Sequence, residues 1–218
     1  NKDWDFRSRI TVGYAKTRIT KVDNSPNIFE LVKAEGANVQ GRPVRSLFSI
    51  DFKSLNEKTG VPVFVNENGE VNSDVYLQDQ NLRYLKYEGP VDPPITGGFN
   101  NTLTYKDFTL NVFLTYQAGN KIRMNPLYKG TTSSSSDFSD LDAMPREFLD
   151  RWVLSGEEAS TTIPNISDKL EQLYLSGTYP YNIFNYSTER VAKGDFIRLK
   201  SVSLLYRVPL PIAAKAGF

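Results

Sequence analysis

The sequence of 218 residues contains no cysteine and no histidine. Without cysteine there is no disulfide framework, no thiolate nucleophile and no cysteine-based metal site. Without histidine the chain lacks the commonest general base, the usual partner of a nucleophilic serine and the most frequent zinc ligand. These two absences argue strongly against hydrolytic or metal-dependent catalysis, so we expect no catalytic residue, no cofactor and no metal ion.

The sequence also lacks a strong charge imbalance and a long apolar run. Its formal net charge is +1 and its Lys and Arg residues are spread along the chain, so nothing indicates a nucleic-acid-binding face. No stretch of about 18 consecutive apolar residues is present, which excludes a transmembrane helix. Tyr, Phe, Gly, Asn, Ser and Thr are common, and this composition favours strands and turns over helices.

Four segments alternate between apolar and polar residues with the period of two that is typical of β-strands. They run over about 4–18, 98–105, 108–118 and 195–208. In the first segment Trp4, Phe6, Ile10, Val12 and Tyr14 fall on one face, and charged or small residues fall on the other. The sequence therefore predicts an all-β protein whose strands each have one apolar and one polar face.

Lys106-Asp107 separates the second and third strands, which predicts a two-residue hairpin with Tyr105 opposite Phe108. In the fourth strand Arg198 and Lys200 have the same parity as the apolar Val202. Either a β-bulge or a polar rim at the strand end would accommodate these two cations, and the sequence does not decide between them.

The other two connections are each nearly eighty residues long, far above the usual length of a loop. Within them we expect short helices over 142–152, where Phe148 and Trp152 share a face, and over 167–175, and a small hairpin over 61–71. Acidic clusters at 66–70 and 137–142 match no EF-hand spacing, and no pair of carboxylates is fixed at the separation that a glycosidase needs. A short turn between long loops is typical of outer-membrane β-barrels.

Several stretches, in order along the chain, resemble the SusC/RagA family of TonB-dependent outer-membrane transporters. They are Gly41-Arg-Pro43, Tyr87-Glu-Gly-Pro90, Pro94 to Thr102, Tyr105-Lys-Asp-Phe108, Gln117 to Ile122, Arg151-Trp152 and Gly194 to Val202. Each stretch alone is weak, and Asp107 stands where the family more often has Gly, but the ordered set is fairly specific.

The resemblance implies that this chain is an incomplete segment, residues 1–218, of a transmembrane antiparallel barrel of about 22 strands, with four strands here and long extracellular loops that carry short helices. The plug domain and the terminal strands are expected to lie outside it. The implied function is TonB-dependent import of oligosaccharides, or less often peptides, across the bacterial outer membrane. The implied partners are a SusD-like surface lipoprotein, outer-membrane lipid and, through parts absent here, the TonB complex.

Two groups of residues are then candidates for contact with ligand or lumen. Aromatic side chains can stack on sugar rings, although packing within a loop is the commoner role of any one ring. The candidate ligand-binding residues are Trp152, Tyr174, Tyr179, Tyr181 and Tyr186; the candidate lumen-facing residues are Arg7, Arg9, Asn111 and Gln117. The competing interpretations are a soluble carbohydrate-binding or adhesion β-protein and, less favoured, an enzyme domain.

Overall fold

The computed structural model of the chain describes residues 3–78, 82–128, 144–166 and 179–210. The chain divides into two compact units, each built from segments that are distant in sequence. The first, here called the sheet unit, comprises Asn1–Lys16, Pro93–Asn120 and Gly194–Phe218. The second, here called the core unit, comprises Thr17–Asp92 and Lys121–Lys193.

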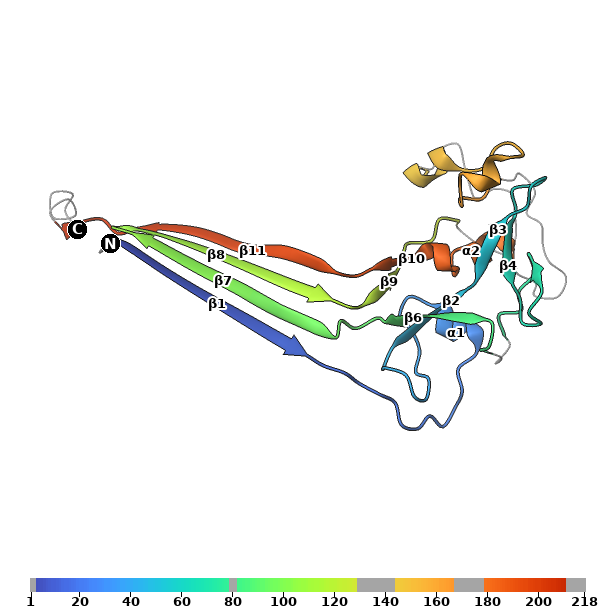
Figure 1. Cartoon of the computed structure of the whole chain (residues 1–218), viewed down its shortest axis with the longest axis horizontal. Coiled ribbons are helices and arrows are strands. Elements are labelled where there is room, and N and C mark those ends of the chain that lie inside the picture. Colours follow the sequence, from blue (N-terminus) through green and yellow to red (C-terminus); the bar gives the residue numbers. More distant parts are fainter. Residues whose placement is uncertain (1–2, 79–81, 129–143, 167–178, 211–218) are drawn as a thin grey trace. The chain divides into compact units, whose positions relative to one another are not determined.

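The sheet unit is one antiparallel sheet of four strands of equal length. In spatial order they are β1 (Trp4–Tyr14), β7 (Ile95–Tyr105), β8 (Phe108–Ala118) and β11 (Phe196–Tyr206), and each has 11 residues (Figure 1). The predicted strands are therefore confirmed, although β1 ends at Tyr14, before the predicted Arg18, and β7 begins at Ile95, before the predicted Gly98.

The predicted hairpin joins β7 to β8, and Tyr105 pairs with Phe108 beside the turn. Lys106 adopts a positive φ of 51°, a conformation that favours glycine or asparagine, so this lysine is held there by the pairing on either side. The turn also binds its neighbours: the Lys106 amide donates to the Asp3 carbonyl at 3.0 Å, and the Arg207 amide donates to the Asp107 carbonyl at 2.8 Å.

A β-bulge interrupts the pairing of β11 with β8 between Leu199 and Ser201. Lys200 is the extra residue, so the parity of the strand changes at this point. Arg198 consequently pairs with Thr115, whose side chain lies on the polar face, while Leu199 pairs with Leu114 on the apolar face. Of the two alternatives that the sequence left open, the structure has the bulge.

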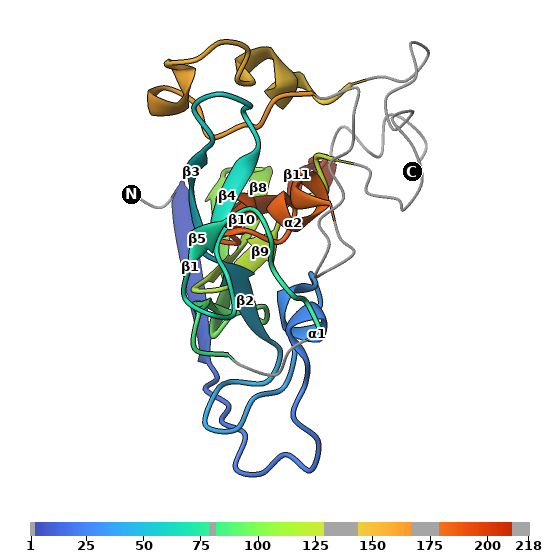
Figure 2. The ribbon, with the colours of Figure 1, turned by 90° about the vertical axis from the view of Figure 1, so that its right-hand side faces the viewer.

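The core unit contains three small antiparallel sheets and two short helices. The sheets are β2 (Ser46–Ile50) with β6 (Leu85–Pro90), β3 (Phe52–Leu55) with β4 (Pro62–Val65) and β5 (Val71–Asn72), and β9 (Lys121–Arg123) with β10 (Val191–Lys193); the helices are α1 (Ile28–Val32) and α2 (Pro180–Phe184). Figure 2 shows β3, β4 and β5 side by side. The β4–β5 pair confirms the hairpin predicted over 61–71.

Two local signals explain the short helices. Asn27 caps α1, because its side chain accepts a hydrogen bond from the Glu30 amide while the Glu30 carboxylate accepts one from the Asn27 amide, both at 3.0 Å. Pro180 begins α2, where its fixed φ suits the first turn. The sequence analysis predicted neither helix, although the Asn27–Glu30 spacing is a recognisable capping box.

The hydrophobic core lies in the core unit and is built largely from aromatic and branched side chains. Its fully buried members are Ile28, Leu31, Val32, Ile50, Phe64, Val75, Ile183 and Phe184. The predicted helix over 142–152 is instead a 3-10 helix at Arg146–Asp150, in which Phe148 is buried. Two 3-10 turns follow at Glu157–Ala159 and Thr188–Arg190, while the helix predicted over 167–175 lies outside the described residues.

Candidate functional site

The sheet unit has one face of almost entirely apolar side chains, which we call the apolar face. Directly paired residues of neighbouring strands share a face, so the register assigns its members. They are Trp4, Phe6, Ser8, Ile10, Val12 and Tyr14 of β1; Ile95, Gly97, Phe99, Asn101, Leu103 and Tyr105 of β7; Phe108, Leu110, Val112, Leu114, Tyr116 and Ala118 of β8; and Ile197, Leu199, Val202, Leu204 and Tyr206 of β11.

The side chains of this face on the outer strands are exposed. Phe6 is 64% exposed, Ile10 66%, Ile197 78% and Leu204 68%. A soluble protein rarely leaves so extended an apolar surface uncovered, since isolated exposed residues are normal but a contiguous patch marks a binding or membrane surface. The apolar face therefore requires an apolar environment.

One end of the apolar face is a continuous row of four aromatic side chains, one from each strand. Trp4 pairs with Tyr105, Tyr105 with Phe108, and Phe108 with Tyr206. The rings touch across strands, with centroids 4.2 Å apart for Trp4 and Tyr105 and 4.6 Å apart for Phe108 and Tyr206. At the other end Tyr14 is aromatic, while Ile95 and Ala118, which are paired beside it, are not. A row of aromatic side chains at the border of an apolar band is typical of a membrane interface.

The length of the strands agrees with this interpretation. From Trp4 to Tyr14, an 11-residue strand at about 3.3 Å per residue covers about 33 Å. If the strand is tilted by about 40°, its projection is about 25 Å, which is the usual height of the lipid-facing band in outer-membrane barrels.

The opposite, polar face carries all four residues that the sequence predicts to face a lumen. Arg7 pairs with Thr102, which in turn pairs with Asn111, while Arg9 and Gln117 lie farther along the same face. Arg7 forms an exposed ion pair with Asp5 at 2.8 Å. Next to the hairpin turn, the Thr104 and Thr109 hydroxyl groups are hydrogen bonded at 3.3 Å. This shared face suits contact with water, and its assignment to a lumen remains a prediction.

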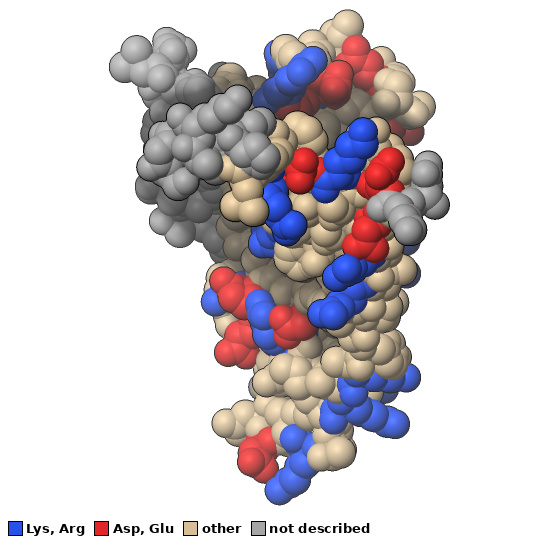
Figure 3. Space-filling model, turned by 90° about the vertical axis from the view of Figure 1, so that its left-hand side faces the viewer, with Lys and Arg blue, Asp and Glu red and all other residues tan. Residues whose placement is uncertain are grey.

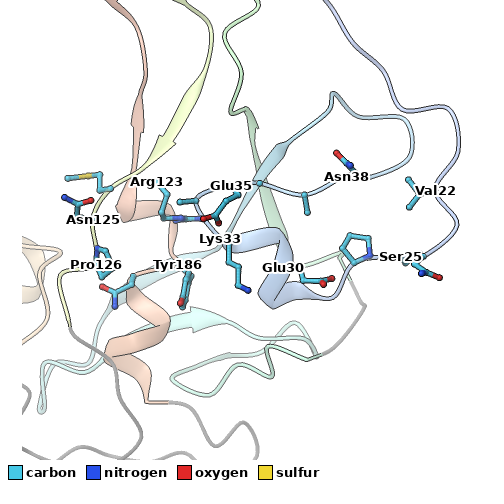
Figure 4. Close-up of a pocket in the computed structure, with 17 residues that line it drawn as sticks. Val22, Ser25, Glu30, Lys33, Glu35, Asn38, Arg123, Asn125, Pro126 and Tyr186 are labelled. Carbon is cyan, nitrogen blue, oxygen red and sulfur yellow. The ribbon is translucent and has the colours of Figure 1, made fainter.

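The core unit contains an open cavity of about 970 Å³. It is bounded by the segment before α1, the C-terminal end of α1 with the turn after it, the stretch after β9 and the end of α2. Figure 4 shows Arg123, Asn125, Pro126 and Tyr186 on one side and Val22 and Ser25 on the other. Glu30, Lys33 and Glu35 contribute charges of both signs to its lining.

Arg123 is a buried cation at the wall of this cavity. Its guanidinium donates to the carbonyls of Val32 at 3.1 Å, Ser187 at 2.7 Å and Phe48 at 2.7 Å, and to the Ser49 hydroxyl at 3.1 Å. Burial lowers the pKa of Arg123 to about 10, an effect that the nearby Glu88 carboxylate opposes. The group therefore remains charged at neutral pH, and it joins α1, β2 and the turn after α2.

The candidate ligand-binding aromatic residues occupy different environments. Tyr186 is half-buried, lines the cavity and has a raised pKa because of burial. Tyr181 is 3% exposed; its ring lies 5.2 Å from that of Tyr128, and its hydroxyl donates to the Asn165 side chain at 2.5 Å. Tyr179 is partly buried at the start of α2, and Tyr174 lies outside the described residues.

Trp152 is 7% exposed and lies over Gly60, where φ is +66°. Its indole N–H donates to the Glu158 carboxylate at 3.2 Å. Next to it the Glu157 carboxylate accepts hydrogen bonds from the Val153 and Leu154 amides, which lowers the pKa of Glu157. In the structure Trp152 and Tyr181 pack inside the core unit, so their contact with a ligand remains a prediction.

The structure adds residues that the sequence analysis did not select, above all Arg123 and Lys33. No local pattern marks Arg123, because its acceptors lie 64 to 91 residues away in the sequence. Among the described residues no group of three or more acidic, histidine or cysteine side chains is placed to hold a metal ion. None of the helices in this described part of the chain is long and apolar enough to cross a bilayer.

Comparisons with known proteins connect this geometry to one class. No known family model matches the sequence. The TonB-dependent receptor P3 of Formosa agariphila is 20% identical over 240 residues, which cover 100% of this chain and 21% of that protein. The chain has the fold of a TonB-dependent receptor segment. This chain spans about a fifth of the length of the relatives that it matches.

Solved structures show the same likeness to the TonB-dependent receptor fold. A structure of the RagAB peptide transporter has a TM-score of 0.66 and 20% identity, and the match covers 98% of this chain and 22% of that one. The RagAB peptide importer in its closed-closed state has a TM-score of 0.65 at 20% identity, and in its open-open state 0.62 at 18%. The resemblance to the SusC/RagA family is thus confirmed at the level of the fold, along the whole chain.

Proposed function

We propose that this chain is part of the barrel wall and outer loops of a TonB-dependent transporter that imports oligosaccharides or peptides across a bacterial outer membrane. In this proposal the whole protein also has a plug domain and further strands, and a SusD-like surface lipoprotein covers its outer opening. The observation that carries the proposal is the exposed apolar face with a row of four aromatic residues at one end, on a sheet whose other face is mostly polar.

The edges of the sheet support the same proposal. Among the described residues β1 and β11 have a strand neighbour on one side only. In lipid each unpaired backbone group costs several kcal/mol, so membrane sheets close into barrels. Strands of the same protein outside this chain would pair with both edges and complete the wall.

Charge provides a further argument about the partners. Figure 3 shows Lys and Arg interspersed with Asp and Glu over the visible face, and the net charge is +1. A nucleic-acid-binding protein instead gathers its cations on one face. The mixed charges on this face therefore give no reason to expect a nucleic-acid partner.

Site-directed spin labelling tests the two faces of the sheet. The chain has no cysteine of its own, so Val202→Cys and Ser203→Cys place single labels on neighbouring residues of opposite faces within this segment. In the outer-membrane protein reconstituted in bilayers, the label at 202 is expected to be relaxed by oxygen and the label at 203 by an aqueous nickel complex.

Equal aqueous access at both positions would favour the soluble β-protein instead. Transport itself is tested by deleting the gene and, separately, inactivating TonB. Both strains are expected to lose growth on the same scarce oligosaccharide or peptide, and growth of both strains at the wild-type rate on every such nutrient would contradict the proposal.

A further inference from the structure

The cavity of the core unit has a lining that is unusual for a site that binds neutral sugars. Tyr186 is the one aromatic ring among its described lining residues. Sugar sites gain much of their affinity from flat aromatic surfaces, because these pack against the apolar faces of the sugar rings. The rest of the lining consists of small apolar side chains, amides and charges, with Val22, Ala34, Ala37, Asn24, Asn38 and Asn125 among them.

The charges of the lining balance in number. Two carboxylates, Glu30 and Glu35, and two cations, Lys33 and Arg123, line the same cavity. Glu30 is held in place by the cap of α1, and the Lys33 ammonium lies 4.3 Å from the centre of the Phe29 ring. A ligand that carries both an ammonium and a carboxylate would find a group of opposite sign for each.

Arg123 biases one side of the cavity toward an anion. Among the described residues it forms no ion pair, since its hydrogen-bond acceptors are three carbonyls and one hydroxyl. Buried charges are usually paired, because dipoles alone replace only part of the lost hydration. A carboxylate that enters the cavity would therefore gain from the field of this cation without displacing an internal partner.

We propose that the cavity bounded by α1, the turn after it and residues 123–126 binds a short peptide, with the peptide carboxylate on the side of Lys33 and Arg123. The proposal rests on the transport function above and names the substrate class for this site. The Tyr186 hydroxyl has no hydrogen-bond partner among the described residues and is available to the peptide backbone. The volume of about 970 Å³ lies near the upper end of the range for small-ligand sites, about 300–1,000 Å³.

Calorimetric titration of the intact detergent-solubilised protein tests the site. The probes are a tripeptide with a free C-terminal carboxylate, the same tripeptide amidated at its C-terminus, and a neutral and a uronic-acid trisaccharide. The variants are Lys33→Gln and, as a matched control, Lys58→Gln, which removes an exposed lysine outside the cavity lining.

Wild-type protein is expected to bind the free-acid tripeptide about two- to fivefold more tightly than the amide, the range of an exposed ion pair. Lys33→Gln should reduce that difference, because Arg123 remains in the lining, and Lys58→Gln should leave it unchanged. Tyr186→Phe should weaken both peptides about equally, because it removes a hydrogen bond and no charge.

Three results would overturn the site: no preference for the free acid, a preference that Lys33→Gln leaves unchanged, or binding of the uronic-acid trisaccharide without binding of the peptide. Hydrogen exchange in each variant shows whether the core unit is intact, and Lys33→Arg, which restores the charge, should restore the preference. If TonB-dependent growth persists while the titration fails, the site is wrong and the transport proposal stands; loss of TonB dependence would count against the transport proposal alone.

Discussion

Replacing Arg123 by methionine tests whether one buried guanidinium holds the core unit together. The arginine donates four hydrogen bonds to Val32, Phe48, Ser49 and Ser187. Methionine has a similar length and suits a buried site, but it donates no hydrogen bond, so three carbonyls lose their partner. An unsatisfied buried polar group costs about 1–3 kcal/mol, which gives a gross loss of about 3–9 kcal/mol.

Removing the charge also removes the unfavourable burial of a cation, and this gain in stability offsets part of the loss from the broken hydrogen bonds. Burial lowers the pKa of Arg123 from its ordinary value to about 10, and the difference corresponds to about 3 kcal/mol of unfavourable burial of the cation. Because the pKa is lower in the folded than in the unfolded protein, the penalty is present in full below pH 10. It is relieved as the pH rises above 10, where the buried guanidinium loses its proton. Because water from the adjacent cavity can reach some of the carbonyls, we expect a net loss near the middle of the resulting range, about 2–4 kcal/mol.

Hydrogen exchange of β2 and α1 amides in the intact protein measures this loss locally. A loss of about 2–4 kcal/mol corresponds to exchange that is about 30- to 1,000-fold faster when opening limits protection. Arg45→Met is the matched control, since Arg45 is 47% exposed and its ion pair with Asp92 lies at the surface. Acceleration below about threefold at Arg123→Met would refute the reasoning, as would an equal effect of both substitutions.

Two further predictions concern the loop around Trp152. Gly60→Ala should destabilise this loop by about 2–4 kcal/mol, because φ is +66° and the new Cβ would lie 2.3 Å from a Trp152 ring carbon. Gly69→Ala is the control: φ is +80° there, but no atom lies within 4 Å of the new Cβ, so only the backbone strain of about 1 kcal/mol is expected. Thermal unfolding and hydrogen exchange measure the loss of stability in each variant. Equal losses of stability in Gly60→Ala and Gly69→Ala would rule out the clash with the Trp152 ring. The lowered pKa of Glu157 means that its stabilising hydrogen bonds are fully present above pH 4.5 and are lost as the pH falls through the folded-state pKa. Protection of the Leu154 amide should therefore decline in acid, and in Glu157→Gln this pH dependence should disappear; an unchanged acid profile in that variant would contradict the assignment.

The four strands of the sheet unit could be predicted from the sequence, although the end of β1 and the start of β7 differ from the predicted positions. Period-two alternation is a local property, and the two-residue turn at Lys106-Asp107 sets the register of β7 against β8. The register of β11 could not be predicted fully, because a bulge depends on the partner strand. The structure shows that Lys200 is the inserted residue, and this insertion keeps Ile197 and Leu199 on the same face as Val202.

The core unit depends on tertiary structure to a much greater extent. The sequence by itself determined its small hairpin, since that hairpin follows from neighbours a few residues apart. It also determined which residues of the four strands are apolar and which are polar. Only the folded chain decided that Arg123 meets Val32, Phe48 and Ser187, that Trp152 covers Gly60, and that a cavity forms beside α1. These contacts join segments far apart in the sequence, and burial and hydrogen bonding select them only once the whole unit has packed.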